Sequence, residues 1–116
     1  MRAALIACAL LLAGCGGASR TLPAGDADNG KLLLRQFGCG SCHEIPGVAD
    51  AQGRVGPPLK GVARRVYIAG VLPTSPDNMA AFIRTPRRFE PRTVMPEMGV
   101  TEAHARDMVA YLYSLE

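Results

Sequence analysis

Apolar residues recur at helical spacing in three stretches of the chain, and the first stretch begins soon after residue 25. Asp26 or Asp28 can cap a helix at that point, and Gly38 can end it. One face of the predicted helix is apolar, and the opposite face carries charged and polar side chains. The positions that share the apolar face are Gly30, Leu33, Leu34 and Phe37.

A second helix is predicted between Ser75 and Thr85. Ser75 is a suitable N-cap, and Pro76 suits the first helical position because the amide of that position needs no partner within the helix. Pro86 stops the helix. The side chains expected on its buried side are Met79, Phe82 and Ile83.

The last helix is predicted from Thr101 to the end of the chain. Thr101 is a good N-cap, and Glu102 brings negative charge to the positive end of the helix. Because Gly30 costs stability inside the first helix, its presence favours a close crossing with the last helix. The apolar stripe of the last helix consists of Ala105, Met108, Val109, Leu112 and Leu115, flanked by Tyr111 and Tyr113.

The alternation of apolar and polar residues that is typical of strands is weak throughout. The best candidate, Val66–Leu72, is short and contains Gly70. The chain has no internal repeats and no low-complexity runs. We therefore predict an all-α fold of three to four helices.

Composition adds the expectation of a bound group. A chain of 116 residues is long enough for one small domain, and 48% of its residues are hydrophobic, but only 5% are aromatic and Trp is absent. The apolar core is therefore small, and small domains usually need a further stabilising feature in addition to their core. A large apolar bound group would supply one. The formal net charge of +3 is too small to indicate a nucleic-acid partner, and no basic run is interleaved with aromatic residues.

The N-terminal segment has the pattern of an export signal. A charged start at Arg2 precedes the apolar run Ala3–Leu12, which is too short to span a bilayer. The run ends in Leu12-Ala13-Gly14-Cys15, which resembles a bacterial lipoprotein box, so residues 1–14 are predicted to be removed and Cys15 to be lipidated. The alternative is an ordinary signal with an incidental cysteine.

Residues 15–25 are predicted to form a lipidated, flexible tether, because they are small, polar and interrupted by proline. The protein would then be exported, on the periplasmic side of a bacterial cell, and anchored to a membrane without spanning it. The residue after the predicted lipidation site is Gly16, and not the Asp that would favour retention of the lipoprotein in the inner membrane. By resemblance to lipoprotein sorting signals, the outer membrane is therefore favoured over the inner.

The central motif is C-x-x-C-H, formed by Cys39, Cys42 and His43, which is the attachment pattern of a c-type haem. Two thiols at this spacing can bond to the same porphyrin, and the next residue supplies an imidazole to the iron. A redox dithiol and half of a zinc site remain alternatives. A zinc site would need a second ligand pair, whereas haem needs one more soft ligand, which Met95 can provide.

The order of motifs along the chain resembles class I cytochrome c. Gly38-Cys39-Gly40-Ser41-Cys42-His43 is followed by Gly56-Pro57-Pro58-Leu59, then Met95-Pro96, then a terminal helix ending in Ala110–Leu115. The resemblance covers about residues 26–116, which form the predicted cytochrome c domain. The stretch from Arg64 to Asn78 is especially similar to the cytochrome c domain fused to subunit II of some haem-copper oxidases.

The resemblance implies one covalent haem c, with Cys39 and Cys42 in thioether bonds and His43 and Met95 as iron ligands. It further implies that the Pro57 carbonyl accepts a hydrogen bond from the second nitrogen of His43, which would orient the ring. The helix crossing would involve Gly30 and the Tyr111–Leu112 region. The resemblance also implies that Leu59 packs on the haem ring. Arg65, with Arg64 beside it, is a candidate for contact with a haem propionate, because a planar guanidinium suits a carboxylate; the alternative is a solvated pair on a loop.

Several details leave alternatives open. Arg92 replaces the glycine of the family's Pro-Gly-Thr pattern before the methionine, and Met98 is a second possible ligand. His104 is expected to be exposed to solvent in the first turn of its helix. A cluster of four arginines would either steer an acidic redox partner or only solubilise the surface. The cluster consists of Arg84, Arg87, Arg88 and Arg92.

The predicted function is single-electron transfer between respiratory protein partners, without a small-molecule substrate, so the protein would be a carrier and not an enzyme. With His43 and Met95 both bound to iron, no position is left for a substrate. One alternative is a haem c subunit of a larger dehydrogenase or oxidase complex. Another is a sensor or enzyme whose sixth position opens, which would need a distal acid or base that the sequence does not offer.

Overall fold

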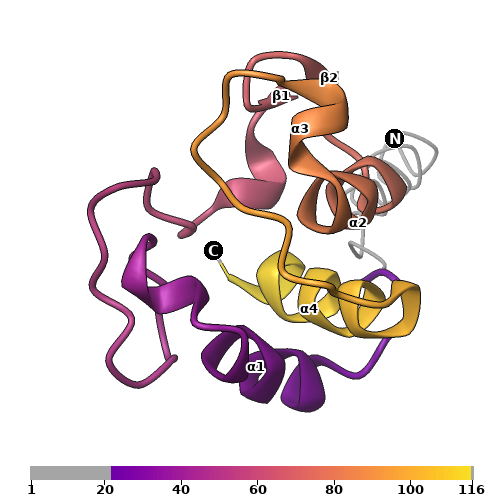
Figure 1. Cartoon of the computed structure of the whole chain (residues 1–116). Coiled ribbons are helices and arrows are strands. Elements are labelled where there is room, and N and C mark those ends of the chain that lie inside the picture. The colour runs from indigo at the N-terminus through magenta and orange to yellow at the C-terminus, as the bar shows by residue number, and fades with distance from the viewer. Residues whose placement is uncertain (1–21, 116) are drawn as a thin grey trace, which may run out of the picture.

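The computed structural model describes residues 22–115. The predicted signal peptide, Cys15 and the first part of the predicted tether lie outside the described residues. Four helices carry the fold (Figure 1): α1 (Ala27–Gln36), α2 (Pro76–Arg84), α3 (Pro86–Phe89) and α4 (Glu102–Ser114). The smaller elements are the 3-10 turns η1 (Cys39–Ser41) and η2 (Val62–Arg64) and the strands β1 (Tyr67–Ile68) and β2 (Leu72–Pro73).

Helix α1 begins and ends at the residues that the sequence indicates. The side chain of Asp26 accepts a hydrogen bond from the amide of Asn29, so Asp26 and not Asp28 is the N-cap. Gly38 takes the left-handed conformation, with φ of 71°, directly after the helix. This turn directs the chain from α1 into η1, where the C-x-x-C-H motif begins.

Helices α1 and α4 cross closely at Gly30, as predicted. A Cβ atom built on Gly30 would lie 1.9 Å from the carbonyl oxygen of Asp107, so no side chain fits between the two backbones. The closest approach is therefore at Asp107 and Met108, about one helical turn before the predicted Tyr111–Leu112 region. Glycine is required at this position because the neighbouring atoms belong to the backbone of α4 and cannot rotate away.

A carboxylate on α4 reinforces this crossing. Asp107 accepts hydrogen bonds from the backbone amide of Asp26 and from the side-chain amide of Asn29, both at 2.8 Å. These two bonds, with the Asp26 amide the stronger influence, lower the pKa of Asp107. The start of α1 is thus tied to the middle of α4. Of the predicted tether, residues 22–25 fall within the described chain, and Gly25 lies against the carbonyl of Arg106 on α4.

Helix α2 packs against α4 and has the predicted cap. The Ser75 hydroxyl accepts a bond from the amide of Asn78, and Met79 and Phe82 are buried. Pro86 follows the end of α2, as predicted, but it also occupies the first position of α3, a one-turn helix that was not predicted from the sequence. Four residues with two arginines give too short a pattern for detection by periodicity.

The small sheet is a hairpin that begins in the segment Val66–Leu72, which showed the best alternation, and extends to Pro73. Strands β1 and β2 pair antiparallel through Tyr67 with Pro73 and Ile68 with Leu72. The turn between them uses Ala69 and Gly70, both with positive φ. Strands of two residues do not change the class of the fold, and the all-α prediction is confirmed.

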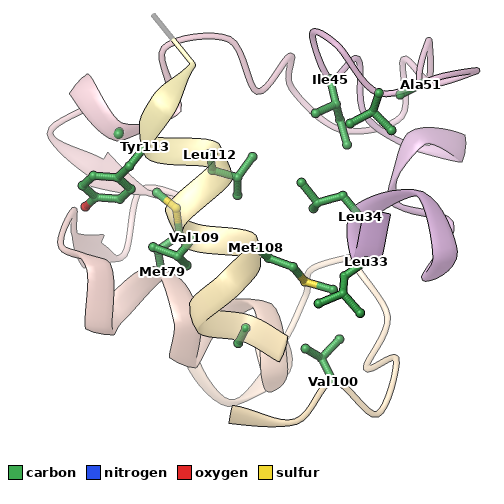
Figure 2. Close-up of a cluster of buried hydrophobic side chains, with 13 residues drawn as sticks. Leu33, Leu34, Ile45, Ala51, Met79, Val100, Met108, Val109, Leu112 and Tyr113 are labelled. Carbon is green, nitrogen blue, oxygen red and sulfur yellow. The ribbon is translucent and has the colours of Figure 1, made fainter. Parts of the chain in front are cut away.

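The hydrophobic core lies between α1 and α4, with α2 on the other side of α4 (Figure 2). Leu33 and Leu34 point from α1 toward Met108 on α4, while Met79 approaches α4 from α2. The loop after the C-x-x-C-H motif adds Ile45 to the same core. Further buried members of this cluster are Val48, Ala51, Val100, Ala105, Val109, Leu112 and Tyr113.

Tyr111 connects the C-terminal helix with the loop that follows the motif. Its hydroxyl donates a hydrogen bond to the carbonyl of Pro46 at 2.6 Å. Burial raises the pKa of Tyr111, which favours the protonated hydroxyl that donates this bond. A side chain on Gly47 would meet this hydroxyl at 2.4 Å. The motif loop is therefore supported by residues from the far end of the chain.

In the stretch from residue 22 to residue 115, none of the helices has the length and apolarity needed to cross a bilayer.

Candidate haem site

The C-x-x-C-H motif forms one tight turn at the end of α1. Cys39 opens η1, the amide of Cys42 donates to the Cys39 carbonyl at 3.2 Å, and the amide of His43 donates to the same carbonyl at 3.0 Å. In a 3-10 turn, residues three apart project from the same side. This geometry brings both thiols to one side of the turn, as attachment to a single planar group requires.

Cys39 does not have the properties of a reactive redox thiol. Its side chain packs against the hydrophobic core, and this burial raises the pKa of the Cys39 thiol, with the neighbouring Cys42 adding a smaller effect in the same direction. Thiols of redox motifs have lowered pKa values because their thiolates are stabilised. The structure thus gives no support to the alternative of a redox dithiol.

His43 is held through one ring nitrogen. Its Nδ1 lies 2.7 Å from the carbonyl oxygen of Pro57. Since a carbonyl can only accept, Nδ1 carries the proton, and in the neutral imidazole the lone pair is then on Nε2. An acceptor on the second nitrogen of a histidine fixes the tautomer and the orientation of the ring, and raises the basicity of the free nitrogen. His43 therefore presents Nε2 as a metal ligand.

The loop of residues 51–59 lies against the motif and is hydrogen-bonded to it. Three amides of this loop donate to carbonyls of the motif region: Gly53 to Gly40 at 3.0 Å, Gly56 to Cys42 at 2.8 Å, and Leu59 to Glu44 at 2.9 Å. Leu59, which was predicted to pack on the haem, is half-buried beside the core. The loop thus holds the motif by its backbone.

Three glycines allow this close contact, and their role was not predicted from the sequence. A Cβ on Gly40 would lie 2.6 Å from Ala51, and one on Gly53 would lie 2.4 Å from the backbone of Cys42. A Cβ on Gly56 would lie 2.3 Å from Cε1 of His43. None of the three has positive φ, so conformation alone gives no signal in the sequence.

This arrangement fits a haem. Gly56 leaves space for the imidazole of His43, and a single methyl group at residue 56 would fill that space. Two thiols on one turn, next to a histidine whose Nε2 is not hydrogen-bonded, are the groups that covalent attachment and iron ligation require. Within residues 22–115, no three His, Cys, Asp or Glu side chains come together as a metal site. This described part of the chain thus offers no further ligands for a zinc site at the motif.

Met95 is the inner of the two candidate methionines. It is half-buried, and its amide donates to the Thr93 hydroxyl at 3.2 Å, which shapes the loop before α4. Met98 is exposed, with 47% of its surface accessible to solvent. The difference in burial favours Met95 as the sulfur that faces the interior.

The comparison with known proteins agrees with this geometry. Residues 27–116 match the family model for cytochrome c. The chain belongs to the cytochrome c family. Proteins of this family bind covalent haem c and transfer electrons, and in this cytochrome Cys39 and Cys42 occupy the C-x-x-C-H motif.

This cytochrome is also similar to a subunit of an oxidase. It is 31% identical over 91 residues to the cytochrome c oxidase subunit 2 of Alkalihalophilus pseudofirmus. The match covers 78% of this chain but only 26% of that protein. The chain thus spans about a quarter of the relative's length, and the similarity to subunit II that was noted from the sequence is confirmed.

Arg65 lies beside the histidine-binding loop of this cytochrome. Its guanidinium donates to the carbonyl of Pro58, the residue after the acceptor for His43. The neighbouring Arg64 is exposed and has no such bond to the loop. The sequence predicted Arg65 near a propionate and gave no indication of this contact, because a hydrogen bond to a backbone carbonyl leaves no signal in the sequence.

The four arginines of the predicted cluster differ in their surroundings. Arg84 lies 3.9 Å from Glu102, and Arg92 lies 3.7 Å from Glu90, so a carboxylate partly neutralises each of these two. Arg88 stacks over Phe89 at 5.7 Å and keeps its charge, and Arg87 is exposed. Both belong to α3.

His104 is less exposed than the sequence predicted. Its ring packs beside Phe37, with 5.9 Å between the ring centres, and its Nδ1 is buried. The His104 side chain therefore contacts Phe37 at the end of α1, although Glu102 and Ala103 in the same turn are exposed. This position gives His104 a packing role at the helix crossing.

Proposed function

We propose that this cytochrome is a membrane-anchored monohaem protein that carries single electrons between respiratory partners. The observation that supports this most directly is the His43 ring, whose Nδ1 is bonded to Pro57 and whose Nε2 is free for iron. The match of residues 27–116 to the cytochrome c family gives the class of reaction. One C-x-x-C-H motif in the chain supports a single haem.

In this proposal Cys39 and Cys42 hold the haem through thioether bonds, and His43 and Met95 ligate its iron. The haem, when bound, supplies an iron that changes its charge by one electron. The protein binds and orients it: Pro57 sets the tautomer of His43, Leu59 adds apolar cover, and Arg65 contributes positive charge nearby. With His43 and Met95 both supplying ligands, the iron would exchange electrons and the site would leave no place for a substrate to bind.

The proposed anchor rests on the sequence. The apolar run before Leu12-Ala13-Gly14-Cys15 supports cleavage after residue 14 and lipidation of Cys15, followed by a tether through residue 25. The protein would face the periplasm, with the outer membrane favoured by Gly16. Cys15→Ser should abolish both the removal of residues 1–14 and the incorporation of labelled fatty acid, whereas a Cys8→Ser control should retain both. A Cys15→Ser protein that still incorporates labelled fatty acid would contradict the anchor.

The charge distribution supports an acidic protein partner. Residues 52–96 contain eight Lys or Arg and two Asp or Glu, whereas residues 22–51 and 97–115 together contain three and seven. The basic part includes the loop before Met95, and the acidic part includes α1 and α4 (Figure 1). Such asymmetry orients an approaching partner of opposite charge and raises the association rate.

A second candidate is a role as the haem c subunit of a larger complex. The observation that favours this second candidate is the 31% identity to a cytochrome c oxidase subunit 2. A carrier and a subunit would use the same haem site, so they differ only in stable association. Mild solubilisation of native membranes followed by size separation distinguishes them, because a subunit migrates with its complex and a carrier migrates alone.

Absorption spectra of the purified protein in both redox states test the central proposal. We expect a covalently bound, low-spin haem whose ferric form has a weak near-infrared band from sulfur-to-iron charge transfer. Met95→Ala should abolish this band, and the matched Met98→Ala should retain it. Rapid binding of carbon monoxide by the reduced wild-type protein would favour an open sixth position, and a colourless mature protein would refute haem binding.

A further inference from the structure

The chain segment just before α1 packs against two other helices. Pro23 and Ala24 form one side of a groove whose other walls are α2 and α4. The apolar residues that line the helical walls are Pro76, Ala80 and Ala81 from α2 and Val109 from α4. Residues 23–25 are therefore part of the folded domain, and we call them the strap.

The strap is in backbone contact with α4. Gly25 has φ of 141°, and a Cβ built on it would lie 2.6 Å from the carbonyl oxygen of Arg106. Only glycine combines this conformation with so close an approach. The amide of the next residue, Asp26, donates to the carboxylate of Asp107 at 2.8 Å. The strap is thus held in the groove at its start and bonded to α4 at its end.

The strap and the proposed haem site lie at opposite ends of α1 (Figure 1). The strap precedes this helix, and the C-x-x-C-H motif follows it. Helix α1 has ten residues, so it separates the two by about 15 Å. His43 and the loop behind the motif extend the domain beyond that end. The point where the chain leaves the domain is therefore remote from the iron ligand.

The docked strap limits how far the domain can turn on the proposed anchor. With the strap in place, residues 15–22 separate Cys15 from the domain. Eight residues span at most about 28 Å even when fully extended, whereas a domain of this size, with a radius of gyration of about 12 Å, is about 30 Å across. If the strap were released, eleven residues could span about 38 Å. Only the released chain is long enough to lead around the domain.

We infer that the strap orients the anchored cytochrome, so that the end of the domain with α2 and the start of α4 faces the bilayer and the haem-binding end points away from it. The inference rests on the proposed lipidation of Cys15, and it specifies the partners of the proposed haem site. They would be proteins that approach from the aqueous side, and not redox carriers dissolved in the lipid.

The test uses the full-length, lipidated and haem-loaded protein in vesicles of phosphatidylethanolamine and phosphatidylglycerol that contain some nickel-chelating lipid. A nitroxide is attached to a single introduced cysteine, either Asp77→Cys or Gln52→Cys. Asp77 is exposed and lines the groove beside the strap, and Gln52 is exposed in the loop against the motif. Comparison with nickel-free vesicles removes the contribution of the haem iron to the nitroxide relaxation.

Nickel at the vesicle surface should accelerate the relaxation of the label at residue 77 several-fold more than that of the label at residue 52. Equal acceleration at the two residues, or stronger acceleration at residue 52, would overturn the inference. This comparison is made without disturbing the strap, so it does not depend on the folding of a strap variant.

Gly25→Ala tests whether the strap causes the orientation. The added methyl group would meet the carbonyl of Arg106, so the strap should leave the groove and the difference between the two labels should shrink. Gly70→Ala is the matched control, because Gly70 also has positive φ but has no atom within 4 Å of a built Cβ. It should keep the difference. A Gly25→Ala protein that also keeps it would refute the role of the strap.

Incorporation of labelled fatty acid into the wild-type protein separates the two levels of the proposal. A wild-type protein without fatty acid would refute the anchor in the proposed function. A lipidated protein whose two labels respond alike would leave that anchor intact and refute the orientation alone.

Discussion

Replacement of Gly30 by alanine is the most direct test of the helix crossing that closes the fold. The new Cβ would lie 1.9 Å from the Asp107 carbonyl oxygen, 2.4 Å from its carbon and 2.9 Å from the amide nitrogen of Met108. Ordinary contact begins at 3.4 Å, so the helices would have to separate by about 1.5 Å or rotate. All three obstructing atoms belong to backbone.

The expected magnitude combines opposing effects. Alanine improves the helix propensity of α1 by about 1 kcal/mol. Overpacking against fixed atoms costs about 1–3 kcal/mol. Separation also breaks the bonds from Asp26 and Asn29 to Asp107, worth about 0.5–1.5 kcal/mol each and at the lower end for exposed groups. The free energy of unfolding should therefore fall by about 2 kcal/mol.

Guanidinium chloride unfolding of the haem-loaded protein, followed by far-ultraviolet circular dichroism, measures this change. With a slope of about 3 kcal/mol per molar, the midpoint should fall by roughly 0.7 M at an unchanged slope. Lys31→Ala is the control, because it alters an exposed residue of the same helix and should stay within about 0.5 kcal/mol. A Gly30→Ala protein as stable as the wild type would refute the close crossing.

Three further predictions concern charged residues. The lowered pKa of Asp107 means that its carboxylate stabilises the fold above the unfolded pKa of about 4 and loses this effect as the pH falls through the folded pKa; Asp107→Asn should cost about 1 kcal/mol at pH 7, and urea unfolding should show the gap to the wild type closing as the pH falls through the folded pKa of Asp107. Arg65→Leu should lower both the unfolding free energy and the midpoint potential more than Arg64→Leu, because only Arg65 is bonded to the histidine-binding loop; equal effects in electrochemical titration would contradict this. Replacing Arg87 and Arg88 together by Gln should slow electron transfer to an acidic partner about tenfold at low salt and little at high salt in stopped-flow experiments, and a difference that persisted at high salt would argue against steering.

The helices could be predicted from the sequence because their signals are local. Asp26, Ser75 and Thr101 each cap a helix in the structure, and each stands directly before an apolar periodic run. The close crossing at Gly30 was also predictable, since a glycine inside an amphipathic helix lowers helix stability and is favoured where another backbone needs the space. Its exact partner on α4 was not, because the register between two helices depends on packing between segments that lie far apart in the chain.

The contacts around the histidine were predictable only in part. The bond from His43 to Pro57 was expected from the resemblance to class I cytochrome c, and the structure contains that bond. The contact of Gly56 with the ring and the bond from Arg65 to Pro58 were not expected. Both involve the backbone of a loop whose path has no periodicity, and a sequence of glycines and prolines does not specify where that path runs.

The two ends of the domain meet, and this has a consequence for the order of events during synthesis. The contacts of Asp107 with Asp26 and Asn29 join residues 81 and 78 positions apart, and Tyr111 supports the motif loop across 65 positions. A polypeptide made from its N-terminus cannot form these contacts until α4 has been synthesised. The start of α1 and the loop that follows Cys39 and Cys42 therefore lack these supporting contacts until α4 has been synthesised.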